Sequence, residues 1–185
     1  MTILTVGLVL FFAIHAIPLS QTARTSIVLR LGEKSFKGIF SLISIAGFAA
    51  IVIGMKNAPF EPVWSTPMWA TRLTNLMMPV AFCLLVAAYV PNNFRRIVRN
   101  PMLSATLLWS LAHLLSNGDL ASLLLFGSFG LFAIIDIVAV NNRSAAAVTQ
   151  RKPLYFDALT VSVGLLAFWA IRHYHSALFG VPVAY

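Results

Sequence analysis

The chain has 185 residues, of which 59% are hydrophobic and only 10% are charged, with a net charge of +8 and one cysteine, Cys83. A soluble domain of this length is closer to half apolar and a quarter charged, so the composition excludes an ordinary soluble protein. A single cysteine excludes an internal disulfide framework and a Cys-x-x-Cys zinc site.

Six largely apolar runs, bounded by Pro, Gly, Asn or charged residues, have lengths of about 16–22 residues, close to that of a membrane-spanning helix. The runs extend from Ile3 to Leu19, Lys37 to Met55, Arg72 to Val90, Pro101 to Ser116, Asp119 to Val140 and Phe156 to Ala177. Pro101 is a favoured first helical residue, and Asp119 is a good N-cap. The sequence therefore predicts an all-α polytopic membrane helix bundle of about six transmembrane helices, forming one domain over residues 1–185.

The basic residues alternate between the predicted loops. Ten of the thirteen Lys and Arg residues fall in the first, third and fifth loops: Arg24, Arg30, Lys34, Lys37, Arg95, Arg96, Arg99, Arg143, Arg151 and Lys152. By the positive-inside rule these loops are cytoplasmic, which places both termini on the outer, periplasmic side. A nucleic-acid binder would instead gather such charge on one face. We therefore expect the lipid bilayer as a partner, and no nucleic acid.

The fourth run carries a polar stripe. Thr106, Ser110, His113 and Asn117 are spaced so that they share one helix face. Such a stripe should face other helices, because lipid cannot satisfy its hydrogen bonds. One interpretation is interhelical hydrogen bonding. The other is a functional site, since an ionisable side chain inside a membrane usually serves one.

Two further histidines lie in or near apolar runs. His15 follows Phe11 and Phe12 by one helical turn, and His175 lies near the outer end of the last run. Two histidines from different helices can hold haem b between them. At 1.5 Å per residue His15 lies roughly 5–10 Å and His113 roughly 18 Å from the inner boundary, whereas His175 matches His113 better in depth. Both pairings stay open, and Asp136 and Asp157 lie at the wrong end to complete a zinc site.

The sequence also resembles the NnrU family of bacterial inner-membrane proteins. The likeness is carried by residues 100–127, which include Ala-His-Leu-Leu-Ser-Asn-Gly-Asp at 112–119, and by residues 31–38, 86–91 and 175–182. One departure is Arg99-Asn100-Pro101, where many relatives have Arg-His-Pro. A role of that histidine cannot be carried over, and we expect Asn100 to cap the following helix.

The resemblance implies a bacterial inner-membrane location and a link to denitrification or nitric-oxide metabolism, as an accessory factor or sensor for denitrification enzymes. The family is also related to the plant 15-cis-zeta-carotene isomerase, a membrane enzyme that uses haem b. That relationship implies an alternative role, cis–trans isomerisation of a lipid-soluble polyene. By position, His15 and His113 are the expected axial ligands of haem b, with Trp109, Phe11 and Phe12 lining its pocket. His175 is the alternative ligand, and no metal is expected except haem iron.

Overall fold

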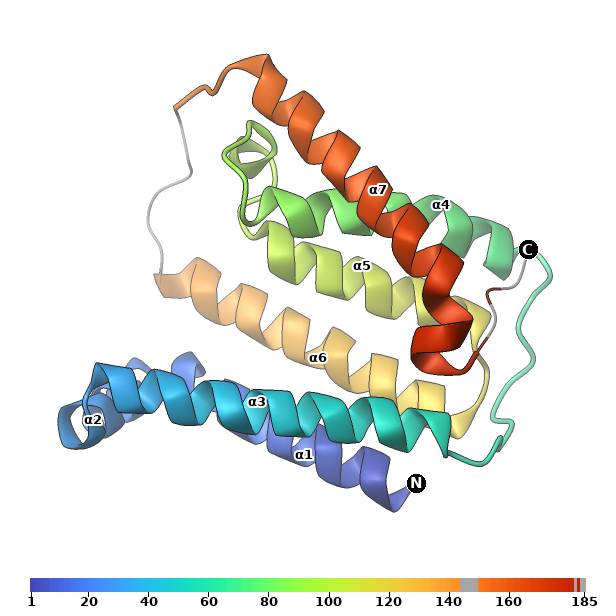
Figure 1. Cartoon of the computed structure of the whole chain (residues 1–185), viewed down its shortest axis with the longest axis horizontal. Coiled ribbons are helices and arrows are strands. Elements are labelled where there is room, and N and C mark those ends of the chain that lie inside the picture. Colours follow the sequence, from blue (N-terminus) through green and yellow to red (C-terminus); the bar gives the residue numbers. More distant parts are fainter. Residues whose placement is uncertain (144–149, 182, 184–185) are drawn as a thin grey trace. The chain divides into compact units, whose positions relative to one another are not determined.

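A computed structural model describes residues 1–143, 150–181 and 183 of the chain. The described residues are largely helical and contain no β-strand longer than one isolated bridge (Figure 1). The chain divides into two compact units, Met1–Glu61 and Pro62–Tyr185, which we call the N-terminal and C-terminal units.

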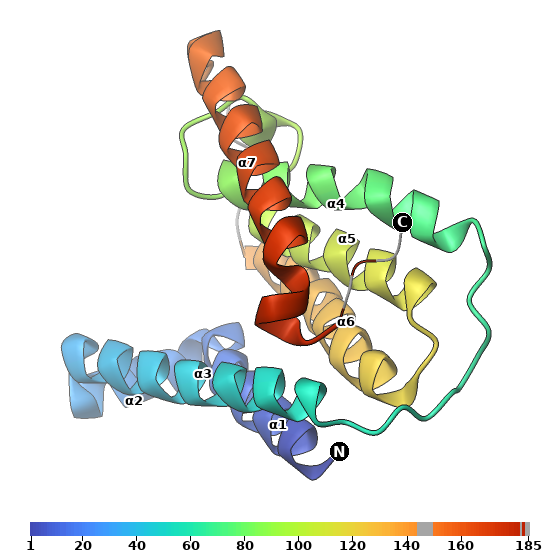
Figure 2. The ribbon, with the colours of Figure 1, turned by 45° about the vertical axis from the view of Figure 1, so that its right-hand side comes forward.

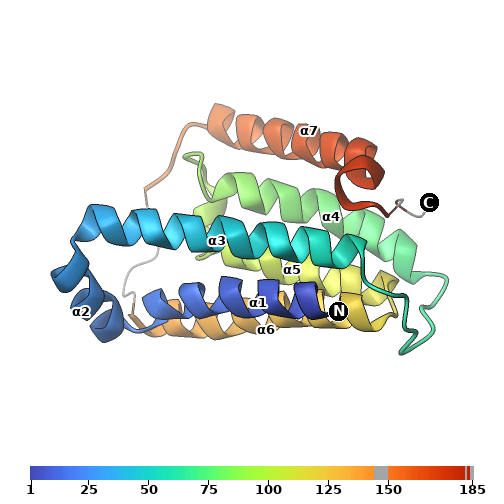
Figure 3. The same cartoon turned by 60° about the horizontal axis from the view of Figure 1, so that its bottom comes forward.

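The N-terminal unit is an antiparallel helical hairpin. Helix α1 (Thr2–Ala16) is followed by a 3-10 turn, η1 (Ile17–Leu19), a short helix α2 (Gln21–Leu31) and the long helix α3 (Glu33–Lys56). Helices α1 and α3 lie side by side in every view, with α2 at the end where the chain reverses (Figures 1 and 3). The reversal occurs at Gly32, whose φ of 81° is available to glycine at little cost.

Helix α2 lies where the sequence predicts only a loop. It begins because the side chain of Ser20 accepts a hydrogen bond from the backbone N–H of Ala23, an N-cap. It is held against α3 by Arg24, which forms an ion pair with Glu33 (2.8 Å) and lies over the ring of Phe36. Eleven residues are too few to cross a bilayer, so α2 adds a helix to the predicted bundle without adding a span.

Glycines allow α1 and α3 to approach closely. A Cβ added to each of three glycines would collide with backbone of the opposite helix: Gly7 with Ile51, Gly47 with Phe11, and Gly54 with Leu4. Small residues at such contacts bring helix backbones together and increase van der Waals packing, which drives helix association in lipid.

The C-terminal unit contains four long helices. Helix α4 (Ala70–Ala87) leads through a 3-10 turn, η2 (Phe94–Arg96), to α5 (Pro101–Ser116), which is followed by α6 (Leu120–Arg143) and α7 (Leu154–Phe179). Helix α5 packs between α4 and α6, and α7 packs on α4 (Figure 2). The predicted fourth run matches α5 at both ends, whereas α4 stops three residues before the predicted Val90.

The two ends of this unit are closed by different hydrogen-bond networks. At one end the backbone N–H groups of Val63 and Trp64 donate to the carbonyl oxygen of Gly118 (2.7 and 3.1 Å). There Asp119 caps α6 as predicted, because its carboxylate accepts the N–H of Ser122 (2.9 Å). At the other end Asn93 joins the α4–α5 loop to the residues that precede α7. The third and fifth loops, both basic, therefore meet at one end.

The helices have the length and surface of membrane spans. Five of them, counting α1 with η1 as Thr2–Leu19, are long and apolar enough to cross a bilayer, and α5 is a shorter apolar helix of 16 residues. Large apolar side chains are exposed along these helices, among them Val9, Leu42, Leu76 and Leu166. The predicted polytopic helical membrane bundle is confirmed. The C-terminus itself, residues 184 and 185, lies outside the described residues, so its predicted position on the outer side stays a prediction.

Candidate functional site

His113 lies on α5 with its imidazole fixed by its own helix. Nδ1 is 2.9 Å from the carbonyl oxygen of Trp109, and because a carbonyl can only accept, Nδ1 carries the proton and donates. In the neutral ring Nε2 is then the basic nitrogen, the one that can bind a metal. The ring also stacks on Phe126 of α6, with centroids 4.5 Å apart. Position and tautomer of this imidazole are therefore both set by the fold.

Trp109 extends the aromatic packing around His113. Its ring lies 5.3 Å from His113 and meets Phe126 and Phe129 of α6 edge-on, at 4.9 and 5.4 Å. Such edge-to-face contacts add to the packing of α5 on α6. Trp109 is thus next to the histidine, and its role as a haem-pocket residue stays a prediction.

His113 and His175 line the same hollow. This hollow has a volume of about 130 Å³ and lies between the N-terminal part of α4 and the C-terminal ends of α5 and α7. Nδ1 of His175 donates to the carbonyl oxygen of Val181 (2.7 Å), so Nε2 is again the basic nitrogen. The polar lining includes Arg172, whose guanidinium donates to Asn75 (2.6 Å). The structure therefore brings two imidazoles of the same tautomer to one cavity.

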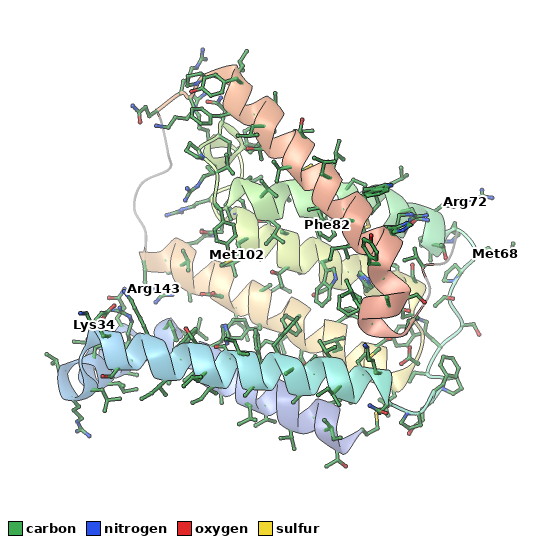
Figure 4. The ribbon with its side chains drawn as sticks, in the orientation of Figure 1. Lys34, Met68, Arg72, Phe82, Met102 and Arg143 are labelled. Carbon is green, nitrogen blue, oxygen red and sulfur yellow. The ribbon has the colours of Figure 1, made fainter. Side chains whose placement is uncertain are left out.

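A second, apolar hollow adjoins the first. It has a volume of about 220 Å³ and shares Met78 and Phe82 with the first hollow. Trp109 and Phe129 line it on the α5 and α6 side. Phe82 lies between α4 and α7, with its ring 6.0 Å from that of Phe168 (Figure 4). Trp109 therefore lines this neighbouring hollow and not the one that His113 and His175 share.

The polar stripe on α5 does not bond across the bundle. Thr106 donates to Met102, His113 to Trp109, and Asn117 to His113, all within α5 or its cap. Ser110 is buried, its hydroxyl has no hydrogen-bond partner among the described residues, and it packs against Gly130 of α6. The interpretation of the stripe as interhelical hydrogen bonding is wrong for these residues. Thr106, His113 and Asn117 donate instead to carbonyl oxygens of their own helix.

Thr74 of α4 makes a polar contact between α4 and α5. Its hydroxyl donates to the carbonyl oxygen of Ala112 (2.6 Å) and meets the hydroxyl of Ser116 at 2.6 Å. Both distances are short, and both partners lie on α5. Thr74 was not among the site residues predicted from the sequence. The signal was available, since Thr74 and Asn75 form a polar pair inside an otherwise apolar run.

Replacing Thr74 with the isosteric valine is expected to lower the free energy of unfolding by about 1 kcal/mol, the usual size of such a bond between membrane helices. Unfolding of the purified protein by SDS in mixed micelles, followed by circular dichroism, measures the change. Thr106→Val is the matched control, because Thr106 bonds only within its own helix. Equal losses in the two variants would remove the α4–α5 contact as the cause.

His15 lies in the N-terminal unit and repeats the local geometry of His113. Its Nδ1 donates to the carbonyl oxygen of Phe11 (2.7 Å), and its ring stacks on that of Phe11 with centroids 4.0 Å apart. Phe12 contacts Phe11 edge-on at 5.4 Å, and Phe40 of α3 lies 5.0 Å from His15. Phe11 and Phe12 thus accompany His15, and the pairing of His15 with His113 stays a prediction.

Other predicted polar residues have structural roles. Asp136 forms an ion pair with Arg143 (3.8 Å), at the end of the same helix. Asn100 occupies the N-cap position of α5, but its side chain makes no capping bond and donates to Asn141 of α6 (3.0 Å). The expected capping by Asn100 is therefore wrong, because its side chain is directed toward Asn141 of the neighbouring helix and accepts no backbone N–H of α5. Within the described residues no three His, Cys, Asp or Glu side chains gather to hold a metal ion.

Comparison with known proteins gives one match. The model of the family described as NnrU protein matches residues 3–183, which is nearly the whole chain. No curated protein and no solved structure matches it.

Proposed function

The chain belongs to the NnrU family, and from that premise we propose that it is a haem b-binding membrane protein in which His113 supplies an axial ligand. The observation that carries the proposal is the imidazole of His113, fixed by Trp109 and Phe126 with Nε2 as its basic nitrogen at a cavity that also holds His175. Histidines that bind iron characteristically donate their other ring N–H to a carbonyl or carboxylate.

The residues around His113 fit the chemistry of haem. Aromatic and thioether side chains such as Phe82, Phe168 and Met78 suit a flat apolar macrocycle, and Arg172 supplies a cation for a propionate. The first hollow, at about 130 Å³, is smaller than a typical cofactor site of roughly 300–1,000 Å³. A haem at His113 would therefore have to occupy both hollows, which adjoin at Met78 and Phe82.

When bound, haem iron supplies reversible redox and ligand-exchange chemistry. The chain's own part is to hold the imidazole of His113 in one tautomer and to surround it with apolar groups. Two candidates exist for the second axial position. His175 lines the same hollow, and His15 has the same local geometry on α1.

The visible spectrum of the protein, purified in detergent from haem-replete cells, tests the proposal. We expect a Soret band from the wild-type protein and a loss of at least about tenfold in bound haem for His113→Ala, because the bond between the imidazole and the iron is lost. The variants His15→Ala and His175→Ala identify the second ligand, because only loss of that ligand alters the Soret band. His173→Ala is the matched control, because His173 is exposed and stacks on Trp169 outside the hollow.

A wild-type protein without a Soret band would overturn the proposal, and so would an unchanged band in His113→Ala. A band that His173→Ala abolishes equally would place the haem on the exposed outer end of α7.

Two physiological roles for such a protein stay predictions. One is an accessory factor or sensor for denitrification enzymes, and the other is isomerisation of a lipid-soluble polyene. Deleting the gene and measuring nitric-oxide consumption tests the first role. Expressing the protein with a poly-cis carotene and measuring isomer ratios tests the second.

A further inference from the structure

The end of the C-terminal unit opposite the first hollow is a fixed surface built from the α4–α5 loop and the residues that lead into α7. The side chain of Asn93 exchanges two hydrogen bonds with the backbone of Lys152: Nδ2 donates to the carbonyl oxygen (2.8 Å), and Oδ1 accepts the N–H (2.9 Å). Asp157 accepts the backbone N–H and the Nδ2 of Asn93, each at 2.7 Å. Asn92 in turn accepts the N–H of Arg95 (3.1 Å). The α4–α5 loop and the start of α7 are therefore held together.

Four exposed arginines project from these joined loops, and we call them the arginine rim: Arg95, Arg96, Arg99 and Arg151. Within the described ranges no ion pair involves any of the four. The acid beside them, Asp157, is already engaged by Asn93. The rim is thus a local excess of positive charge with no compensating carboxylate bound to it.

Large apolar side chains are exposed close to these arginines in the sequence. Ile97, which follows η2, is 85% exposed, and Leu154 and Tyr155 in the first turn of α7 are 79% and 64% exposed. A surface facing only water would leave this apolar area unfavourably hydrated. A surface that combines arginine with leucine, isoleucine and tyrosine matches the boundary between lipid headgroups and acyl chains.

We propose that the arginine rim and Ile97, Leu154 and Tyr155 form a binding site for anionic phospholipid headgroups. The guanidinium groups bind the phosphates, for which their planar N–H donors are suited. The apolar side chains enter the adjacent acyl region. The basic loops lie on the predicted cytoplasmic side, where anionic lipids attract such clusters. This proposal does not depend on haem binding, because none of these residues lines either hollow.

Lipid titration of the purified full-length protein in a neutral detergent tests the proposal, with bound lipid counted by native mass spectrometry. Phosphatidylglycerol is expected to bind at least about tenfold more tightly than phosphatidylcholine with the same acyl chains. The variant Arg95→Gln/Arg96→Gln/Arg99→Gln is expected to lose about a hundredfold in phosphatidylglycerol affinity. Ile97→Ser, which keeps every charge, is expected to lose about tenfold.

The control variant is Arg30→Gln/Lys34→Gln/Arg72→Gln, which removes the same net charge at exposed positions outside the rim. Arg72 lies at the opposite end of the C-terminal unit (Figure 4). The control is expected to keep the wild-type affinity. An equal loss in the control would show an effect of net charge alone and overturn the proposal.

Two other results would overturn it. One is equal affinity of the wild-type protein for the two lipids. The other is displacement of phosphatidylglycerol by inorganic phosphate at the same concentration, which would mark a site for soluble phosphate. Circular dichroism checks that each variant is folded. If the triple variant does not fold, the loss of phosphatidylglycerol affinity is measured in the single variants Arg151→Gln and Ile97→Ser instead.

Discussion

Replacing Gly54 with leucine is expected to separate α1 from α3 and to lower the free energy of unfolding by about 3 kcal/mol. The reason is steric: a Cβ at Gly54 would overlap the backbone of Leu4, so no side-chain rotation can make room for it. Overpacking of this kind typically costs about 1–3 kcal/mol and more where backbone must move. Leu4 is fully buried in the hairpin, so the whole start of α1 would shift.

Hydrogen exchange of the α1 amides, measured by mass spectrometry in detergent, reports this separation together with SDS-induced unfolding. Gly38→Leu in the same helix is the matched control, because a Cβ there meets nothing within 4 Å. Both variants gain the higher helix propensity of leucine, so the difference between them isolates the contact with α1. Unchanged exchange in α1 of Gly54→Leu would contradict the close packing of the two helices.

Replacing Asn93 with alanine is expected to cost about 3 kcal/mol of stability and to release the α4–α5 loop from α7. The variant loses the two bonds to Lys152 and one to the carboxylate of Asp157. A bond to a charged group contributes about 1.5–3 kcal/mol and a neutral one about 1 kcal/mol, less where water can replace the partner. Asn93→Asp should be worse, because it places a second carboxylate against Asp157.

SDS unfolding of Asn93→Ala, Asp157→Asn and the double variant forms a cycle that isolates their coupling. We expect the double variant to cost clearly less than the sum of the single variants, since each removes the same interaction. Asn57→Ala is the control for loss of an exposed asparagine, which there makes one bond to the carbonyl oxygen of Ile53. Additive losses in the cycle would mean that the two residues act separately.

The helices of this protein could be predicted from its sequence because their signals are local. Apolar runs bounded by Pro101 and by the capping residue Asp119 gave the ends of α5 and the start of α6 within one residue. Helix α2 was missed because it is polar, basic and too short to register as a span. Its first turn is capped by Ser20. It is held against α3 by the bond between Arg24 and Glu33, a contact between two different helices that the sequence pattern does not reveal.

The candidate site was predictable to the extent that it depends on depth along the helices. A rise of 1.5 Å per residue places His113 and His175 at similar depth, and both line one hollow. The partners of the polar groups were not predictable in this way. The side chains of Thr106 and Asn117 can donate either to carbonyls of their own helix or to groups on a neighbouring helix. Which partner they take depends on how the helices pack. The same holds for Thr74, whose partners lie 38 and 42 residues away along the chain.

Helix α5 has a consequence for the membrane itself. Its 16 residues give a length of about 24 Å, whereas the hydrocarbon core of a typical bilayer is about 30 Å thick. Such a hydrophobic mismatch is relieved when lipid thins around the short helix or when protein backbone enters the membrane with its hydrogen bonds satisfied. The pairing of Val63 and Trp64 with Gly118 satisfies backbone groups at this end of α5. The membrane next to α5 should therefore be thinner than the membrane next to the longer helices α6 and α7.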